Sequence, residues 1–315
     1  MTLSYEIAAW DNARRHVKTL FALAAALPLV ASIPPLPRLD PALQVNLQAS
    51  LTKLGLDPLV AERKLSVSVL DLSDPLQERY ASFNDRQMMY AASLPKIGIL
   101  LSAFQAIRDG LIASSAMLDA TLTRMIRQSS NDDASRVIQR LGYDFIARTL
   151  ANSRYRFYDP AAEGGLWVGK AYGPSGLRRH VEFWRPEPIS GEWHAANTLQ
   201  AARFLWMLER GQLVTPAASA SMKRMLSQPS ISDYFVEGLR ASGVRDIFRK
   251  SGTFGDTHCD AVLVKHEHKR YVAVAMVNDA RGPQILPKLI QEIHKLVIND
   301  LPESEYGHKG IQSLR

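Results

Sequence analysis

The chain has 315 residues, is 46% hydrophobic and 22% charged, and carries a formal net charge of +7. This composition is typical of a globular protein with a large core and excludes a disordered chain. Basic residues do not cluster with aromatic ones, so we expect no nucleic-acid partner, and a single cysteine, Cys259, excludes an intrachain disulfide and a cysteine-based metal site.

Residues 20–30 form a continuous apolar run behind a basic lead. The run is too short to span a membrane, which takes about 20 residues. With the small residues after it, the segment resembles a secretory signal peptide, although its long lead contains Glu6 and Asp11. We assign residues 1–37 as a leader and proline-rich spacer. We expect a periplasmic or secreted protein without a stable membrane span, or a cytoplasmic one if the segment is an ordinary helix.

The two ends of the following sequence predict a sheet with covering helices. Asp40-Pro41 opens a helix that runs to Leu54. Alternation over 65–69 predicts a strand, with residues 78–83 as its partner. Near the other end, two apolar runs predict a hairpin around a polar turn, and a closing amphipathic helix follows. These last elements cover residues 261–264, 271–277 and 286–297.

The middle of the chain is predicted to be helical. Apolar residues recur at helical spacing from Ile97 to Ile107, and Asp109-Gly110 ends that helix. Two further helical patterns flank a polar interruption at 128–132. Asn197 and Thr215-Pro216 begin two more helices. A glycine- and proline-rich loop over 155–193 is of a length that usually indicates function.

These patterns predict an α+β fold in which both chain ends build one antiparallel sheet flanked by helices. The sheet subdomain takes residues 38–90 and 236–302. The inserted residues 91–235 form a helical subdomain that includes the long loop, and 303–315 form a tail. We expect the functional site in the cleft between the two parts.

Ser93 and Lys96 are the first candidate catalytic residues. Ser93 is predicted at the start of a buried helix, and Lys96 lies three residues later on the same helix face. A serine hydroxyl becomes a nucleophile when a base takes its proton, and a buried lysine amine can be that base. The helix start also offers a backbone N–H to an oxyanion. The structural alternative is a helix cap beside a solvated lysine.

Ser130 and its neighbours interrupt a helical pattern with hydroxyl, amide and carboxylate groups. A second hydroxyl at Ser130 can relay a proton to a leaving group, and Asn131 and Asp132 can hold a substrate amide or the catalytic amine. The alternative is a turn between helices in which Ser130 caps the second helix and acidic residues complement its dipole.

Lys250, Ser251 and Thr253 open the C-terminal strand block. A lysine and hydroxyls at a strand edge suit a carboxylate anion, and Gly252 lets a substrate backbone approach. The N–H of Thr253 is a candidate second oxyanion donor. The alternative is a polar strand start with a bulge glycine.

The three motifs together resemble the penicillin-recognising serine hydrolases, in particular the class A β-lactamase branch, whose signature is Ser-x-x-Lys, Ser-Asp-Asn and Lys-Thr-Gly. The resemblance covers roughly residues 41–297. It implies that Ser93 is acylated, that Lys96 is its base or base partner, and that Ser130 protonates the leaving nitrogen. It implies that Lys250, Ser251 and Thr253 grip a substrate carboxylate, with no metal or organic cofactor.

The chain departs from this pattern in two places. The middle motif reads Ser-Asn-Asp at 130–132, which leaves Asp132 as a candidate substrate contact. The family's deacylating glutamate stands in Arg-x-Glu-x-x-x-Asn, and the best match is Glu187, but Gly191 replaces the asparagine. Glu182 and Glu163 match less well. A solvated loop glutamate is the structural alternative for each.

Three functions therefore stay open. The first is hydrolysis of a β-lactam amide by a monomeric enzyme whose substrate is a small carboxylate-bearing molecule. The second is a D-Ala-D-Ala-type peptidase, an amidase or an esterase that uses the same residues. The third is a β-lactam-binding protein with slow or no turnover, since an acyl-enzyme without a base to activate water persists.

Overall fold

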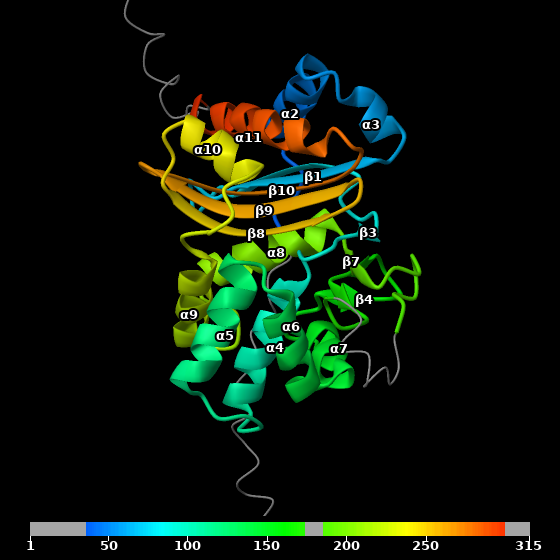
Figure 1. The fold of residues 1–315 in the computed structure, drawn as a ribbon. Coiled ribbons are helices and arrows are strands. Elements are labelled where there is room, and N and C mark those ends of the chain that lie inside the picture. The colour runs from blue at the N-terminus through cyan, green and yellow to red at the C-terminus, as the bar shows by residue number, and fades with distance from the viewer. Residues whose placement is uncertain (1–35, 174–184, 300–315) are drawn as a thin grey trace, which may run out of the picture. The chain divides into compact units, whose positions relative to one another are not determined.

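A computed structural model of the chain describes residues 36–173 and 185–299, and its central feature is an antiparallel five-stranded sheet (Figure 1). The strand order is β2-β1-β10-β9-β8. As predicted, both chain ends build this sheet, because β1 pairs with β10 along its whole length and places Val67 opposite Ala275. The strands are β1 (Leu65–Asp71), β2 (Arg79–Phe83), β8 (Asp246–Phe254), β9 (Thr257–His266) and β10 (Lys269–Asn278).

Helices cover one face of this sheet and enclose an aliphatic core (Figure 1). The first helix begins where the sequence predicts, because Asp40 Oδ1 accepts a 2.7 Å hydrogen bond from the N–H of Leu43. The closing helix is longer than predicted, by about a turn at its N-terminal end. These elements are α2 (Pro41–Lys53), the short α3 (Asp57–Ala61), α10 (Phe235–Ala241) and α11 (Gly282–Asn299).

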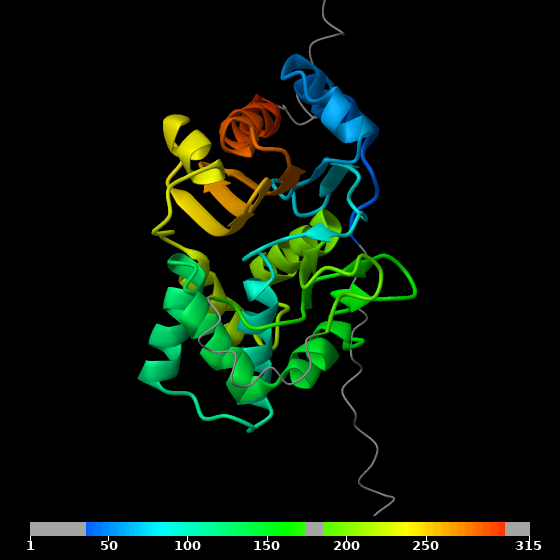
Figure 2. The ribbon, with the colours of Figure 1, turned by 45° about the vertical axis from the view of Figure 1, so that its right-hand side comes forward.

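The opposite face of the sheet is covered by α8 (Thr198–Glu209), which contacts β1, β9 and β10 (Figure 2). Asn197 caps α8 by accepting a 2.9 Å bond from the N–H of Gln200, as predicted. The other helices pack below α8. They are α4 (Lys96–Arg108), α5 (Ala116–Arg127), α6 (Asn131–Leu141), α7 (Tyr143–Ala151) and α9 (Pro216–Leu226). The helices α3, α7 and α10 have no counterpart in the sequence prediction.

The loop predicted over 155–193 contains short strands that belong to two smaller sheets. Strands β4 (Tyr158–Asp159) and β5 (Gly164–Gly165) pair with each other, and β6 (Trp167–Val168) and β3 (Met89–Tyr90) pair with opposite edges of β7 (His194–Ala196). The N–H of Ala91 donates a 2.7 Å bond to the carbonyl of His194. The end of the loop is therefore fixed beside the chain that leads into Ser93.

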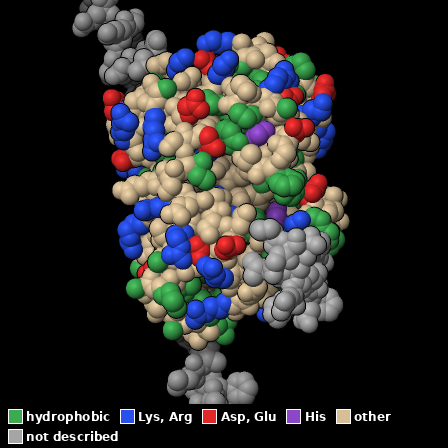
Figure 3. Space-filling view, in the orientation of Figure 1, with side chains coloured by type: hydrophobic (Ala, Val, Ile, Leu, Met, Phe, Trp, Pro, Cys, Tyr) green, Lys and Arg blue, Asp and Glu red, His purple; other side chains and the backbone are tan. Residues whose placement is uncertain are grey.

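Basic and acidic side chains are interspersed over the face seen in Figure 3. Among the described residues, none of the helices has the length and apolarity needed to cross a membrane. Residues 1–35 of the predicted leader and spacer (1–37) and the predicted tail at 303–315 lie outside the described residues.

Candidate active site

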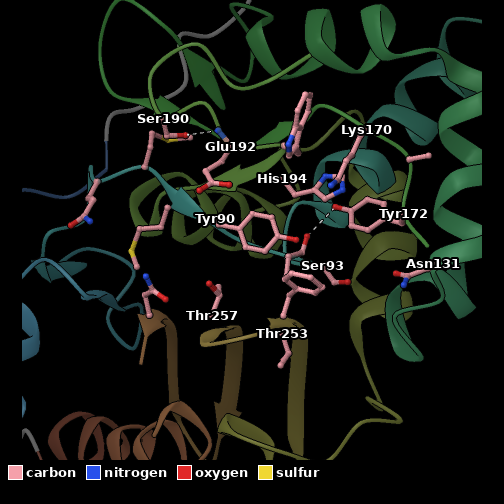
Figure 4. A pocket seen from close by; sticks show the side chains of 18 of the residues that line it. Tyr90, Ser93, Asn131, Lys170, Tyr172, Ser190, Glu192, His194, Thr253 and Thr257 are labelled. Carbon is pink, nitrogen blue, oxygen red and sulfur yellow. Dashed lines mark hydrogen bonds between the residues drawn. The ribbon is translucent and has the colours of Figure 1, made fainter. Parts of the chain in front are cut away.

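Ser93 lies in the turn between β3 and α4 and lines a pocket of about 950 Å³ (Figure 4). The preceding residue, Ala92, has a positive φ of 46°. A residue other than glycine in this conformation stores strain, which often accompanies functional sites. The turn therefore holds the Ser93 hydroxyl where the sequence predicts it, directly before a buried helix.

Lys96 is the first residue of α4, and its side chain is fully buried. Its Nζ lies 3.0 Å from Ser93 Oγ, 2.7 Å from Asn131 Oδ1 and 2.6 Å from the carbonyl oxygen of Ser129. Burial lowers the pKa of this amine to about 7. Near neutral pH a large fraction of Lys96 is therefore uncharged and able to take a proton from Ser93.

Tyr172 covers the Lys96 amine, which lies 4.4 Å from the centre of its ring. The Tyr172 hydroxyl donates a 3.2 Å bond to the Ala92 carbonyl. The backbone N–H of Tyr172 donates to the Ser135 hydroxyl, and that hydroxyl donates to the Tyr172 carbonyl. These three bonds fix the tyrosine. His194 stacks on the same ring at a centroid distance of 3.9 Å. Burial, with repulsion from Lys170 and Lys96, lowers the pKa of His194 to about 3, so its imidazole is neutral. No motif in the sequence marks Tyr172 or His194 as a site residue.

The second hydroxyl of the site belongs to Ser129, not to Ser130 as predicted. Ser129 Oγ lies 2.9 Å from Lys250 Nζ and 3.4 Å from Lys96 Nζ, and Ser129 has a positive φ of 55°. Ser130 Oγ instead accepts a 3.2 Å bond from the N–H of Asp133 and caps α6. The signal that identifies Ser129 is the spacing, since Ser129-Ser130-Asn131 places its first serine and its asparagine as Ser-Asp-Asn does.

Asn131 and Asp132 are the first two residues of α6 and make different contacts. Asn131 contacts the Lys96 amine, one of the two contacts predicted for this pair. Asp132 is exposed on α6 near Gly173, and no hydrogen bond joins it to Lys96 among the described residues. The predicted substrate contact of Asp132 stays a prediction.

Lys250 reaches the site from β8 and is only 2% exposed. Its Nζ donates to Ser129 Oγ and, at 2.5 Å, to the carbonyl of Ser251. Burial above all, and then the nearby charges of Lys96 and Arg249, hold the pKa of this amine well below its usual value. Lys250 therefore lies close enough to Ser129 to exchange a proton with it.

Gly252 brings β8 against the Ser93 turn. A Cβ at this position would lie 2.3 Å from the carbonyl oxygen of Ala91 and 2.8 Å from the backbone nitrogen of Ser93. The prediction that Gly252 makes room for a substrate backbone is therefore wrong, because the protein's own backbone fills that space.

Ser251 and Thr253 alternate with Lys250 and Gly252 along β8. Ser251 is buried opposite Asp260. Thr253 is exposed and lines the pocket, and its hydroxyl lies 2.9 Å from that of Tyr234. Of the three residues predicted to hold a carboxylate, Thr253 is the one that borders the open pocket.

Glu187 is buried within its loop, 1% exposed, and is not solvated as the structural alternative assumed. Its carboxylate accepts bonds from the Tyr158 hydroxyl at 2.5 Å and from the N–H and hydroxyl of Ser190 at 2.6 and 2.7 Å. Burial alone raises its pKa, but these bonds lower it overall. Glu187 does not line the Ser93 pocket, and the glutamate that does is Glu192 (Figure 4).

Glu163, one of the two weaker glutamate candidates, does not line the pocket that contains Ser93. Glu163 pairs with Arg86 at 2.7 Å, and Glu182 lies outside the described residues. Within residues 36–173 and 185–299, no three histidine, cysteine, aspartate or glutamate side chains gather as a metal site.

Comparisons with protein families and with solved structures both find proteins similar to this chain. The model of the β-lactamase enzyme family matches residues 118–301, more than half of the chain. None of the curated proteins matches. Among solved structures, the chain is similar to PBP-A at 17% identity and a TM-score of 0.63, over 85% of this chain and 100% of that one.

Two further structures extend the comparison. A mutant of PBP-A in an acyl-enzyme complex with penicillin G is 18% identical with a TM-score of 0.60, over 85% of this chain and 100% of that one. A class A β-lactamase representative from Bacteroides cellulosilyticus DSM 14838 is 13% identical with a TM-score of 0.61, over 84% and 100%. At these identities the similarity shows a common fold. Together with the family match over more than half of its length, this establishes that the chain belongs to the β-lactamase enzyme family.

Proposed function

We propose that the protein is a serine hydrolase that forms an acyl-enzyme on Ser93 and hydrolyses the amide of a β-lactam. The observation that carries this proposal is the 3.0 Å contact between Ser93 Oγ and the buried Lys96 amine, whose pKa of about 7 leaves it able to act as a base.

In the proposed acylation step, every proton that leaves one group is taken up by another. Lys96 Nζ takes the proton of Ser93 Oγ while that oxygen bonds to the lactam carbonyl carbon. The N–H groups of Ser93 and Thr253 are the proposed donors to the oxyanion. As the carbon–nitrogen bond breaks, Ser129 gives its proton to the departing nitrogen. The Ser129 oxygen recovers a proton from a neighbouring lysine, for which the 2.9 Å contact with Lys250 and the 3.4 Å contact with Lys96 support either route.

A second candidate is a peptidase or β-lactam-binding protein that is acylated in the same way and released slowly. The contacts of Glu187 favour this candidate, because its carboxylate already accepts hydrogen bonds from the hydroxyls of Tyr158 and Ser190 within the loop. Among the described residues, no carboxylate hydrogen-bonds Lys96, whose amine faces Tyr172 instead. The penicillin G acyl-enzyme of a PBP-A mutant supports acylation by penicillins in either case.

Time-resolved intact mass separates the candidates. The protein is mixed with benzylpenicillin, and the adduct is followed alongside Ser93→Ala. A transient adduct with loss of substrate supports hydrolysis, and a lasting adduct supports the second candidate. If wild type forms no adduct, or if Ser93→Ala forms the same one, the acyl-enzyme proposal is wrong.

Location and assembly are also proposals. The leader resemblance supports export to the periplasm. We also propose a monomer whose pocket binds a small carboxylate-bearing substrate. Fractionation of cells and the molar mass in solution test these two points.

A further inference from the structure

A chain of three hydrogen-bonding side chains runs from the pocket into the protein at the end of β8. Thr253 Oγ1 lies 2.9 Å from the hydroxyl of Tyr234, and the same hydroxyl lies 2.8 Å from Nδ1 of His258. Thr253 and His258 face each other directly in the β8–β9 ladder. Only Thr253 among the three borders the pocket.

The inner part of this chain is held firmly. Tyr234 and His258 are 5% and 6% exposed, and Tyr234 has a positive φ of 52°. The start of α11 packs on the imidazole, since a Cβ at Gly282 would lie 2.2 Å from the ring. Neither ring has space to turn away, so the two contacts fix how the Thr253 hydroxyl can point.

The single proton of the Tyr234 hydroxyl links the two contacts. If Nδ1 of His258 is unprotonated, Tyr234 donates to it and accepts the proton of Thr253, which then offers only lone pairs to the pocket. If Nδ1 carries a proton, it donates to Tyr234, and Tyr234 donates to Thr253. The Thr253 proton is then free to bond an anion in the pocket.

We propose that Tyr234 and His258 are positioning residues that set the direction of the Thr253 hydroxyl proton, and that protonation of His258 frees this proton to bond the substrate carboxylate. The inference rests on the proposed function, because it concerns the carboxylate of the substrate that acylates Ser93. It adds two residues behind the pocket to the recognition of that anion.

The charges around His258 set the pH range of the effect. Burial lowers its pKa, and this outweighs the opposing attraction of Asp256, Asp233 and Asp279. The imidazole is therefore neutral at neutral pH and becomes charged below the ordinary histidine pKa of about 6.5. The contact with the carboxylate should strengthen as the pH falls through the acid range.

The test compares benzylpenicillin with its methyl ester, which lacks the carboxylate. The acylation rate constant of each is measured from pH 5 to 8, and their ratio cancels the titration of Lys96. For wild type, the ratio should rise as the pH falls. For Tyr234→Phe, no hydroxyl takes up the Thr253 proton, so the ratio should be independent of pH and close to the wild-type value at pH 5.

Two further variants keep the test decisive. Tyr271→Phe removes a similar tyrosine–histidine bond, 3.1 Å to His294 Nδ1 in the buried core, and should leave the ratio at its wild-type value. Thr253→Val changes an exposed residue and removes the proposed donor, so its ratio should be independent of pH and about fivefold lower than the wild-type value at pH 5, the worth of one hydrogen bond.

Each possible result either supports or overturns the proposed role of Tyr234 and His258. A wild-type ratio that does not change with pH, or variants at Tyr234 and Thr253 that keep the wild-type dependence on pH, overturn the inference while the acyl-enzyme proposal stands. If neither compound acylates the wild type, the proposed function fails, and the inference fails with it.

Discussion

The amine of Lys250 donates a 2.9 Å hydrogen bond to the hydroxyl of Ser129 across 121 positions of sequence. This bond joins β8 of the sheet to the turn between α5 and α6. It distinguishes Ser129 from the adjacent Ser130, whose hydroxyl caps α6.

The two serines should therefore respond differently to alanine. Ser129→Ala should slow acylation by benzylpenicillin about 100-fold, because it removes the proton donor for the leaving nitrogen. Ser130→Ala should keep the acylation rate and lose about 1 kcal/mol of unfolding free energy with its helix cap. Adduct kinetics and denaturant unfolding measure the two effects, and a larger rate loss in Ser130→Ala would contradict the assignment.

The acylation rate should increase with pH through about 7. Lys96 has a pKa lowered to about 7, and only its neutral amine can take the Ser93 proton, so the rate rises as the amine deprotonates and levels off above. The measurement is the adduct formation rate from pH 5.5 to 9 with a pH-stable penicillin. A rate that is constant over this range would remove Lys96 as the base.

Tyr172 should set the pH at which this rise occurs. Tyr172→Leu opens the covered side of the Lys96 amine to water, which should raise the pKa of Lys96 and move the midpoint of the profile to higher pH by about one unit. Tyr172→Phe keeps the ring and should leave the midpoint in place. Equal shifts in both variants would show that the hydroxyl bond to Ala92, and not the ring, controls Lys96.

Glu187 should matter for stability more than for turnover. Glu187→Gln replaces a buried carboxylate that accepts bonds from Tyr158 and Ser190, and should cost about 1–3 kcal/mol of unfolding free energy. Because its folded-state pKa is lowered, the carboxylate stabilises the protein above its unfolded pKa, and this contribution is lost as pH falls through the folded one. The stability difference between wild type and variant should therefore shrink in acid, as urea unfolding at pH 7 and pH 3 would show.

The same variant tests the deacylation base. The rate at which the Ser93 adduct disappears should stay within about twofold of wild type after the Glu187→Gln change. A loss near 100-fold, the range of a general base, would return Glu187 to the catalytic mechanism.

Gly252→Ala should abolish acylation. Its methyl group would lie 2.3 Å from the Ala91 carbonyl, so β8 or the Ser93 turn must move, and a displacement of about 1 Å can cost 100-fold in rate. Gly255→Ala is the matched control, since nothing lies within 4 Å of a Cβ there, although its φ of 56° adds strain. Benzylpenicillin adduct kinetics compare the two, and wild-type acylation in Gly252→Ala would contradict the close packing.

The sequence by itself determined the elements whose signals are local. Asp40, Asn197 and Thr215 begin their helices through bonds to residues three positions away, and apolar alternation marked the strands. It also determined the order of the motifs and hence the fold class, and it placed Ser93 and Lys96 together, because three residues along one helical turn fix their distance.

The tertiary structure decided that the hydroxyl of Ser129 meets the lysines and that the hydroxyl of Ser130 caps a helix. Both serines lie in the turn between α5 and α6, where Ser129 has a positive φ of 55°, so regular helical geometry does not fix the directions of their side chains. The sequence also did not determine which groups hydrogen-bond Glu187 or that the Tyr172 ring covers Lys96. Both features depend on contacts between segments far apart in the chain.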